Sequence, residues 1–479
     1  MLETLCRSCL LVPQCKEKKT DCTEYKPADN GGSLFKYHTV PYEHQKKCLY
    51  FMCANKQAAL FLDMGTGKTK IVLDYIVNND LRPVLILCPK SVLSVWKNEI
   101  FKHTPELIND AGYIETKEEI GKYQISITNY EKVRLWIRDF IKIKYQLMIC
   151  DESTKIKNFR ATVTKRVIYL GSKIPNRYIM SGTPIVNDEI DIWSQFLFMD
   201  QGKTFGSNLY EFRQKYYTPD LYTPAWVIRP GAHNEITKKM RPLSYIISKK
   251  DCLDLPDKVY ETRDIPMTSE QDRVYGEMYR TFEARINSES NLSTQWILAQ
   301  LIFLQEIASG YIHNPETNET HAIPHNKITY LNEILEEIPD KKVILWVRFT
   351  YNLIEIEENL KKTRRPYLIL KSSMSTRQRS DILNMFTTGE APYVLITNPA
   401  LSGYGLNLTC AHYAIYYSNS FNYSDRIQSE DRLHRIGQKN KVTYIDLITK
   451  NTIETRITNV LQKKQNLLES ILEGIKKTG

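Results

Sequence analysis

A glycine-rich turn near the start of the chain has residue types that could hold an anion. The segment "AALFL" is an apolar strand pattern, and "KTKIVLDYIV" begins an amphipathic helix pattern. Between them stand Gly65, Thr66, Gly67, Lys68 and Thr69. Glycines let backbone amides curl toward a phosphate at a helix N-terminus, a lysine can reach the β- and γ-phosphates, and a threonine hydroxyl can ligate Mg²⁺. The strict phosphate-loop pattern wants glycine where Leu62 stands, so a plain glycine turn is the alternative.

An acidic pair provides the second half of a nucleotide-hydrolysing site. The apolar segment 147–150 predicts a strand, and Asp151 and Glu152 follow at its carboxyl end. An aspartate there can hold Mg²⁺, and an adjacent glutamate can deprotonate the attacking water. The alternative is an acidic cap on the next helix. The two patterns occur together in one chain, about 80 residues apart, and together they favour a nucleotide site.

Further polar segments follow in order. "SGTP" at 181–184 is a polar turn after an apolar strand, and "GYGLNLT" at 403–409 is a glycine turn between two apolar strands. "QSEDRLHRIGQ" at 428–438 predicts a helix with Arg432 and Arg435 on one face. Two such arginines usually form a solvated face, but facing a triphosphate they would stabilise charge developing on the γ-phosphoryl group.

Composition places the chain among ordinary globular proteins. Its 479 residues are 42% hydrophobic and 25% charged, and the length predicts roughly two to four domains. No apolar run approaches the roughly 20 residues needed to cross a bilayer, and the N-terminus lacks a signal-peptide pattern. We therefore expect no membrane association and a cytoplasmic location, in a bacterial or phage-infected cell, with the nucleus left open. The net charge of +10 is compatible with nucleic-acid binding and with a merely lysine-rich surface.

Four cysteines fall close to the N-terminus. Cys6, Cys9, Cys15 and Cys22 have C-x2-C-x5-C-x6-C spacing. Four thiolates can close around one tetrahedral Zn²⁺, which would supply the folding energy that so small a segment lacks. An iron–sulfur cluster and unliganded thiols are the alternatives. The sequence predicts a zinc-binding module over 1–29, which is also a candidate contact for a protein partner.

Taken in order, these motifs resemble helicase superfamily two, and within it the Swi/Snf-like branch of DNA-translocating ATPases. "MGTGKT", "DEST", "SGTP", "GYGLNLT" and "QSEDRLHRIGQ" are similar to the nucleotide and coupling motifs of that branch. "PYEHQKKCLYFM", "LILCPKSVLSVWKNEI" and "ISITNYEKV" resemble its adenine-contacting and DNA-contacting segments, and "KKVILWVRFTYNLIEIEENL" the start of its second lobe. The resemblance spans roughly residues 40–460.

The alternation of apolar strands and amphipathic helices predicts an α/β fold of two doubly wound parallel sheets, and the resemblance implies that these are two tandem RecA-like lobes. Lobe 1, the ATP-binding lobe, is expected over 30–255 with a protrusion at about 200–250, and lobe 2, the helicase C-terminal lobe, over 256–479 with a helical protrusion at about 268–325. The protrusions would grip duplex DNA, although the aromatic and basic residues at 213–233 are equally compatible with plain packing.

The resemblance also implies site residues. ATP and Mg²⁺ would be bound by Gln45, Gly65, Thr66, Gly67, Lys68, Thr69 and Gly405, with Thr69 and Asp151 holding the metal. Catalytic roles fall on Lys68, Asp151, Glu152 as general base, Gln428, and Arg432 and Arg435 as arginine fingers. DNA phosphates would be contacted by Lys90, Ser91, Thr128, Asn129, Tyr130, Arg348, Thr397, Asn398 and Asn407.

Two positions depart from the family pattern. Thr154 stands where the acidic motif usually has histidine, which puts the coupling efficiency in doubt, and Tyr404 interrupts a common glycine pair. The expected function is an ATP-dependent translocase on double-stranded DNA, without sequence specificity and as a monomer. A strand-separating helicase, with single-stranded DNA as its track, and an ATP-switched DNA-binding module with little turnover are the alternatives.

Overall fold

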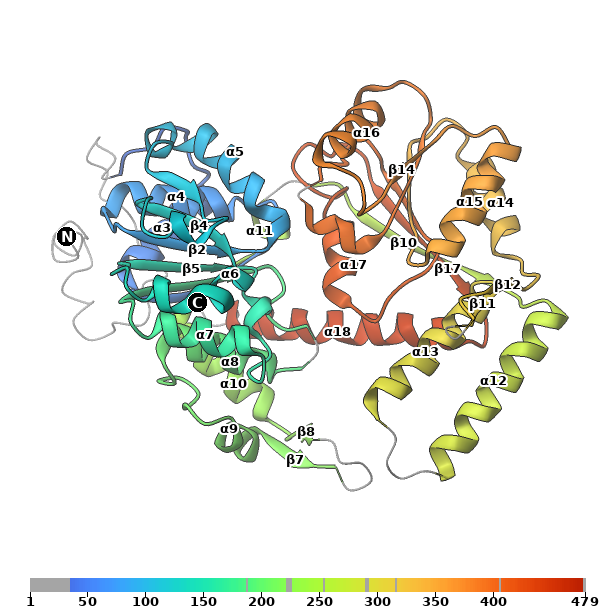
Figure 1. Cartoon of the computed structure of the whole chain (residues 1–479), viewed down its shortest axis with the longest axis horizontal. Helices are drawn as coiled ribbons and strands as arrows, with labels where there is room; N and C mark the ends of the chain where they lie inside the picture. The colour runs from blue at the N-terminus through green and yellow to red at the C-terminus, as the bar shows by residue number, and fades with distance from the viewer. Residues whose placement is uncertain are drawn as a thin grey trace. The chain divides into compact units, whose positions relative to one another are not determined.

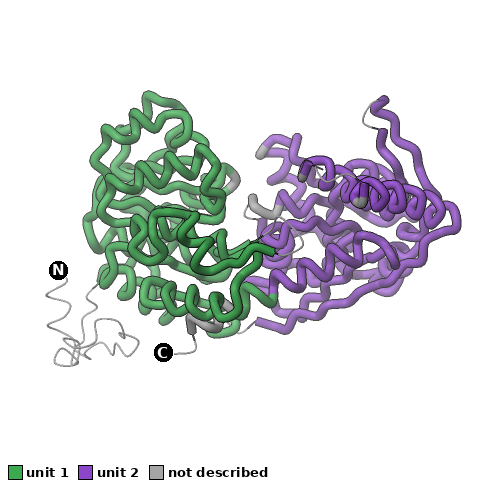
Figure 2. The backbone as a smooth tube through the Cα atoms, turned by 90° about the horizontal axis from the view of Figure 1, so that it is seen from below, with its two compact units in different colours: residues 1–254, 466–479 green, residues 255–465 purple. Residues whose placement is uncertain are grey.

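The computed structural model describes residues 35–186, 188–220, 226–252, 255–288, 293–314, 317–404 and 406–476. The predicted zinc ligands Cys6, Cys9, Cys15 and Cys22, and the predicted nucleotide contact Gly405, lie outside the described residues. The chain forms two compact units, coloured separately in Figure 2. Unit 1 comprises Met1–Asp254 with Asn466–Gly479, and unit 2 comprises Leu255–Gln465.

Unit 1 is built on a seven-stranded sheet in which every neighbouring pair is parallel. The strand order is β3-β4-β2-β5-β6-β1-β9. The strands are β1 (Gln57–Leu62), β2 (Val84–Cys88), β3 (Ala111–Tyr113), β4 (Ile125–Asn129), β5 (Leu147–Asp151), β6 (Asn176–Ser181) and β9 (Ser244–Ile247). The central strands β2 and β5 consist of apolar residues, apart from Asp151 at the end of β5, because a parallel sheet is covered on both faces.

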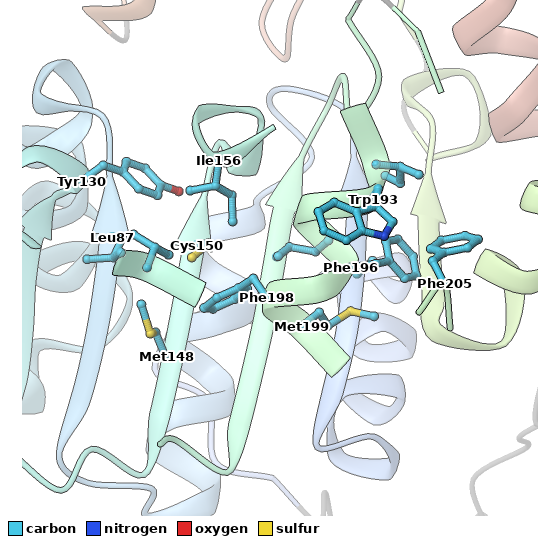
Figure 3. Packing of buried hydrophobic residues seen from close by; sticks show 14 of the residues in the cluster. Leu87, Tyr130, Met148, Cys150, Ile156, Trp193, Phe196, Phe198, Met199 and Phe205 are labelled. Carbon is cyan, nitrogen blue, oxygen red and sulfur yellow. The ribbon is translucent and has the colours of Figure 1, made fainter. Parts of the chain in front are cut away.

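Helices cover both faces of this sheet (Figure 1). Alternate strand residues point to opposite faces, so Leu85 and Leu87 join one core while Val84 and Ile86 join the other. The first core packs against α6 (Tyr130–Phe140), α7 (Thr162–Gly171), α8 (Asp191–Asp200) and α10 (Ala232–Met240). The second packs against α3 (Glu43–Ala54), α4 (Lys68–Asn79) and α5 (Leu93–His103). Figure 3 shows part of the first core, where Met148 and Cys150 of β5 lie among aromatic side chains.

Unit 2 contains a six-stranded sheet that is also parallel throughout. Its order is β10-β17-β16-β13-β15-β14. The strands are β10 (Lys258–Ile265), β13 (Val343–Trp346), β14 (Tyr367–Leu370), β15 (Val394–Thr397), β16 (Tyr413–Tyr416) and β17 (Val442–Thr449). Its helices are α14 (Lys327–Glu337), α15 (Thr350–Lys362), α16 (Thr376–Thr388), α17 (Tyr423–Glu430) and α18 (Ile453–Lys476), whose last residues belong to unit 1.

Two segments interrupt the strand–helix alternation. The segment in unit 1 contains α9 (Leu209–Tyr216), β7 (Tyr217–Pro219) and β8 (Trp226–Ile228), and it precedes α10 and α11 (Lys249–Cys252). The segment in unit 2 contains α12 (Ser269–Ser288), α13 (Thr294–Ala308), β11 (Tyr311–His313) and β12 (Thr320–Ala322). The helices α12 and α13 pack together, with the rings of Phe282 and Trp296 centred 5.6 Å apart.

The predicted fold class, two doubly wound parallel-sheet lobes, is confirmed. Within the described residues, no helix combines the length and apolar character that crossing a membrane requires.

Candidate functional site

The order of strands in unit 1 gathers the predicted motifs along one edge of the sheet. Parallel strands have their carboxyl ends at the same edge, where α/β folds bind ligands. Along β4-β2-β5-β6-β1 that edge carries, in turn, the segments "ITNY", "CPKS", "DEST", "SGTP" and "GTGKT". The register places Asp151 opposite Met180 and Ser181 opposite Phe61, so the acidic pair and the glycine turn are separated by one strand.

The glycine turn joins β1 to α4 as predicted. Gly65 and Gly67 have φ angles of 83° and 88°, in the left-handed region that favours glycine. A Cβ atom on Gly67 would lie 2.1 Å from the Gln45 side-chain nitrogen, so this glycine also makes room for α3. The Gln45 amide nitrogen donates to the Thr66 carbonyl oxygen at 3.1 Å, which places this predicted adenine-contacting residue against the turn.

The lysine and threonines of this turn have distinct partners. The Nζ of Lys68, the first residue of α4, donates to the Leu62 carbonyl oxygen at 2.8 Å. The buried Thr66 donates its hydroxyl to the Asp63 carbonyl oxygen at 2.8 Å. Thr69 lies in the first turn of α4 and is partly buried. Lys68 and Thr69 thus stand at a helix N-terminus, where an anion is stabilised by the free amides and the dipole.

The acidic pair lies at the end of β5 and is buried. Asp151 accepts the indole N–H of Trp96 at 3.0 Å on one carboxylate oxygen and the Glu152 backbone N–H at 3.1 Å on the other. Burial and the neighbouring charge of Glu152 raise the pKa of Asp151 to about 6, against the opposing charge of Lys68. Glu152 has a left-handed backbone, with φ 52° and ψ 57°, a strained conformation for a non-glycine residue that is often found at functional sites.

This donor set fits Mg²⁺ bound with a nucleotide. Mg²⁺ prefers oxygen ligands and usually takes one or two carboxylates together with phosphates. Asp151 is 5% exposed, so its negative charge is costly until a cation lies nearby. Thr69 would supply the second protein oxygen, and the bound metal would neutralise charge on the phosphates. Among the described residues, no group of three or more histidine, cysteine or acidic side chains is placed to hold a metal alone.

The predicted phosphate contacts of unit 1 differ in accessibility. Lys90 is exposed, and Ser91 shares its 3-10 turn, η1 (Lys90–Val92). Thr128 is 1% exposed and donates its hydroxyl to the Ile114 carbonyl oxygen at 3.1 Å. The side chain of Asn129 caps α6 by accepting the Lys132 backbone N–H.

Tyr130, the last of these predicted contacts, has its ring inside the protein. It is 6% exposed, and its hydroxyl donates to the Asp151 main-chain oxygen at 2.7 Å. Figure 3 shows the hydroxyl pointing toward the strand that carries Cys150. Its burial, followed by the charges of nearby groups, raises the pKa of Tyr130 well above its ordinary value. The side chain of Tyr130 therefore lies in the core and bonds to the backbone of the acidic pair.

The predicted phosphate contacts of unit 2 lie mainly at the ends of β13 and β15, which are neighbours. The Asn398 side chain donates to the Arg348 carbonyl oxygen at 3.1 Å, so the two loops are joined. The guanidinium of Arg348 donates to the Gln305 side chain. Thr397 is buried and donates to the Leu370 carbonyl oxygen, whereas Asn407 is exposed.

The helix predicted over 428–438 is wrong in its second part, because α17 ends at Glu430. Arg432 and Arg435 instead lie in the turns that follow. The carbonyl oxygen of Arg432 accepts the Leu408 backbone N–H at 3.0 Å, and the Gln438 amide donates to the Leu433 carbonyl oxygen at 3.3 Å. The carbonyl groups of Arg432 and Leu433 thus have partners other than those of a continuing helix.

The two predicted arginine fingers therefore differ in exposure. Arg432 is 7% exposed, while Arg435 is partly exposed and donates to the Leu406 carbonyl oxygen at 3.3 Å. Gln428, on α17, donates to the Ser424 hydroxyl at 3.2 Å. Arg435 is the more accessible of the two guanidinium groups.

A buried ionic network holds α17 against the sheet of unit 2. The Nε of Arg426 lies 2.8 Å from Glu430, and its Nη1 lies 2.5 Å from Asp446 on β17. Glu430 also lies 3.0 Å from the Nζ of Lys258 and accepts the Tyr260 hydroxyl at 2.7 Å, both on β10. Although burial raises the pKa of Glu430, the charges of Lys258 and Arg426 outweigh it and lower the value from 4.5 to about 2.

Replacing Glu430 by alanine is expected to lower the free energy of unfolding of unit 2 by about 3–5 kcal/mol, because Arg426 and the partly buried Lys258 lose a buried carboxylate. Since the folded pKa is depressed, the contribution of Glu430 is present above pH 4.5 and is lost as the pH falls toward 2. Urea unfolding of the wild type and the variant at neutral and acidic pH measures both effects. The control is Glu277→Ala, which removes an exposed pair with Arg273 and should cost less than about 1 kcal/mol. An equal loss in the two variants would contradict the prediction.

Sequence reasoning missed several residues that the structure places at the site. Trp96 lies in "SVLSVWKNEI", where its only signal is one large aromatic among residues of an amphipathic helix. His44 lies 3.0 Å from the Thr66 carbonyl oxygen, and Asp63 accepts the Lys249 backbone N–H at 2.9 Å. These contacts join residues far apart in the chain, which no local pattern reveals.

Comparison with known protein families agrees with this arrangement. The model of the SNF2-related domain matches residues 44–310, more than half of the chain, and the helicase conserved C-terminal domain matches residues 326–437. The chain belongs to the SNF2-related family. The resemblance to the Swi/Snf-like branch of helicase superfamily two is thereby confirmed. The first match includes the glycine turn and the acidic pair, and the second includes Arg432 and Arg435.

Individual relatives of this SNF2-related chain are described as helicases or translocases. An uncharacterized ATP-dependent helicase of Mycoplasma genitalium is 27% identical over 86% of this chain and 40% of its own length. A putative ATP-dependent helicase/translocase of Bacillus subtilis is 26% identical over 95% of this chain and 51% of its own. The chain therefore spans about half or less of these curated relatives. A solved structure, the SWI2/SNF2 ATPase core of Sulfolobus solfataricus in complex with double-stranded DNA, has 26% identity, 92% coverage of this chain, 94% of its own and a TM-score of 0.45.

Proposed function

We propose that this SNF2-related protein hydrolyses ATP to translocate along double-stranded DNA. The observation that carries the proposal is the strand order of unit 1, which brings the nucleotide motifs and the predicted DNA-contacting motifs to one sheet edge. A single edge that carries both kinds of motif can link ATP turnover to contact with a polyanion. Membership of the SNF2-related family and relatives named as helicases or translocases support the same assignment.

Each residue of the proposed nucleotide site has one role in the reaction. The turn 65–69 cradles the phosphates, and Lys68 exchanges its bond to the Leu62 carbonyl oxygen for a bond to the triphosphate. Asp151 and Thr69 hold Mg²⁺, and Glu152 orients and deprotonates the attacking water. Gln45, already against the turn, contacts the adenine. Arg432 and Arg435, with Gln428 nearby, stabilise the charge that develops on the γ-phosphoryl group.

DNA is contacted through its phosphates in this proposal. Exposed Lys90 and Asn407 provide side chains, and the loops after β4, β13 and β15 provide backbone amides and asparagines. Such contacts position a protein without reading bases, so the motor acts without sequence specificity. The predicted zinc site at Cys6, Cys9, Cys15 and Cys22 stays a prediction, as does a cytoplasmic location, which the bacterial relatives support.

Double-stranded DNA is expected to stimulate ATP hydrolysis more strongly than single-stranded DNA or RNA at equal nucleotide concentration. The purified chain should also displace a triplex-forming strand in an ATP-dependent manner without releasing strands of the duplex itself. A Lys68→Ala variant is the control for contaminating ATPases. Strand release would replace translocation by helicase action, and DNA affinity that changes with ATP without turnover would favour an ATP-switched binding module. Equal stimulation by RNA and duplex would contradict the choice of DNA.

A further inference from the structure

Asp151, the proposed metal carboxylate, is held by two buried aromatic donors. The indole N–H of Trp96 donates to its Oδ2 at 3.0 Å, and the Tyr130 hydroxyl donates to its main-chain oxygen at 2.7 Å. Both rings are buried, at 0% and 6% exposure. One donor thus orients the side chain and the other orients the backbone of the same residue. A buried carboxylate needs such partners, because an unpaired charge in the interior is strongly unfavourable.

Each donor belongs to a helix that begins at a predicted DNA-contacting loop. Trp96 is on α5, which follows η1 with Lys90 and Ser91. Tyr130 is the first residue of α6 and directly follows Asn129. The strands that precede these two helices are β2, before η1 and α5, and β4, before α6. These strands are neighbours, and β2 also pairs with β5, which ends at Asp151. The side chains of Trp96 and Tyr130 therefore link the segments that precede α5 and α6 to Asp151.

Hydrogen bonds order the first turns of both helices. A displacement at the start of α5 or α6 would therefore be passed along an ordered helix to Trp96 or Tyr130. The Tyr113 hydroxyl donates to the carbonyl oxygen of Leu93, the first residue of α5, at 2.6 Å. Asn129 caps the start of α6 through the Lys132 backbone N–H at 3.1 Å. Packed interiors transmit small displacements rather than absorb them, because they contain few voids.

Ordinary packing of a tryptophan does not require a bond of this kind. Trp193 on α8 is equally buried, at 1% exposure, and within the described part of the chain its indole N–H has no hydrogen-bond partner. This fold therefore accommodates a buried tryptophan without pairing its nitrogen. Trp96 differs because its nitrogen meets the carboxylate that lies beside Glu152 and within range of Lys68.

We infer that Trp96 and Tyr130 are positioning residues for Asp151, and that they convey contact of DNA with residues 90–91 and with Asn129, at the end of β4, to the metal-holding carboxylate. The inference rests on the proposed function for its DNA arm and on the geometry of unit 1 for its metal arm. Neither residue touches the reacting atoms. Their effect is on how Asp151 is presented to Mg²⁺ and on how DNA changes that presentation.

Trp96→Phe tests the metal arm, because phenylalanine keeps an aromatic ring and removes the indole N–H. Outer-shell partners of metal ligands typically contribute 10–100-fold, so the Mg²⁺ concentration needed for half-maximal binding of a fluorescent ATP analogue should rise by about that factor. Binding of the analogue without Mg²⁺ should be unchanged. Trp193→Phe is the matched control and should shift the Mg²⁺ requirement by less than about threefold. Equal Mg²⁺ requirements in the two variants would overturn the role of Trp96.

Tyr130→Phe tests the DNA arm with the loss of a single hydroxyl. We expect the stimulation of ATP hydrolysis by duplex DNA to fall by about tenfold, with kcat affected and the KM for ATP nearly unchanged. The matched control is Tyr178→Phe, because Tyr178 is also fully buried and donates to main-chain oxygens, those of Met52 and Asn55. Equal loss of stimulation in both variants would overturn the role of Tyr130.

These outcomes separate failure of the inference from failure of the proposed function. A wild-type protein that duplex DNA does not stimulate contradicts the proposed function, while a raised Mg²⁺ requirement in Trp96→Phe still supports the metal arm. A stimulated wild type whose variants all match their controls contradicts the inference alone. If thermal unfolding shows that Trp96→Phe does not fold, Tyr130→Phe decides both arms through its Mg²⁺ requirement and its DNA stimulation.

Discussion

Replacing Arg435 by alanine is expected to reduce the DNA-stimulated kcat for ATP hydrolysis by about 10³–10⁵-fold, the range found for arginine fingers. This corresponds to about 4–7 kcal/mol of transition-state stabilisation. Arg435 is the partly exposed member of the arginine pair, and it donates to the Leu406 carbonyl oxygen at 3.3 Å. The measurement is steady-state hydrolysis with saturating duplex DNA.

Two variants make this expectation specific. Arg435→Lys keeps the charge but not the planar fork, so it should recover only part of the lost rate. Arg263→Ala removes an arginine on β10 that pairs with Glu337 at 2.7 Å, and it should leave kcat unchanged. Affinity for a fluorescent ATP analogue should change little, because the interaction is gained mainly in the transition state. A loss below about tenfold would contradict the assignment of Arg435 as a finger.

Replacing Glu152 by glutamine is expected to lower kcat by about 10²–10⁴-fold while the protein still binds ATP. Glutamine has nearly the same shape as glutamate but cannot take a proton from the attacking water. The change also removes the charge that helps to raise the pKa of Asp151, so Mg²⁺-dependent nucleotide binding should be retained or strengthened. Single-turnover hydrolysis and equilibrium binding of an ATP analogue separate the two effects.

The control for this variant is another buried carboxylate in unit 1. Asp200 is 2% exposed and accepts the backbone N–H groups of Gly202 and Thr204, both at 3.0 Å, so Asp200→Asn perturbs a turn away from the sheet edge. It should lower stability without changing kcat. Hydrolysis at the wild-type rate in Glu152→Gln would show that another group acts as the general base.

The glycine turn and the acidic pair of the proposed nucleotide site were largely predictable from local patterns. A glycine turn between a strand and a helix requires particular backbone conformations, and Gly65 and Gly67 adopt them. The alternation of apolar strands with amphipathic helices predicted doubly wound parallel sheets, and each unit contains a parallel sheet. Such features depend on neighbouring residues and on the period of the chain, so a sequence displays them directly.

The tertiary structure decided the features that depend on contacts between distant segments. Trp96 and Asp151 are 55 positions apart, and no periodicity links an indole to a carboxylate at that separation. The helix α17 ends at Glu430, before Arg432 and Arg435, and the Arg432 carbonyl oxygen accepts the backbone N–H of the distant Leu408. The sequence by itself determined which chemical groups the protein possesses and which elements bear them. Only folding decided which groups meet, because hydrogen bonds and burial act between atoms that are close in space rather than along the chain.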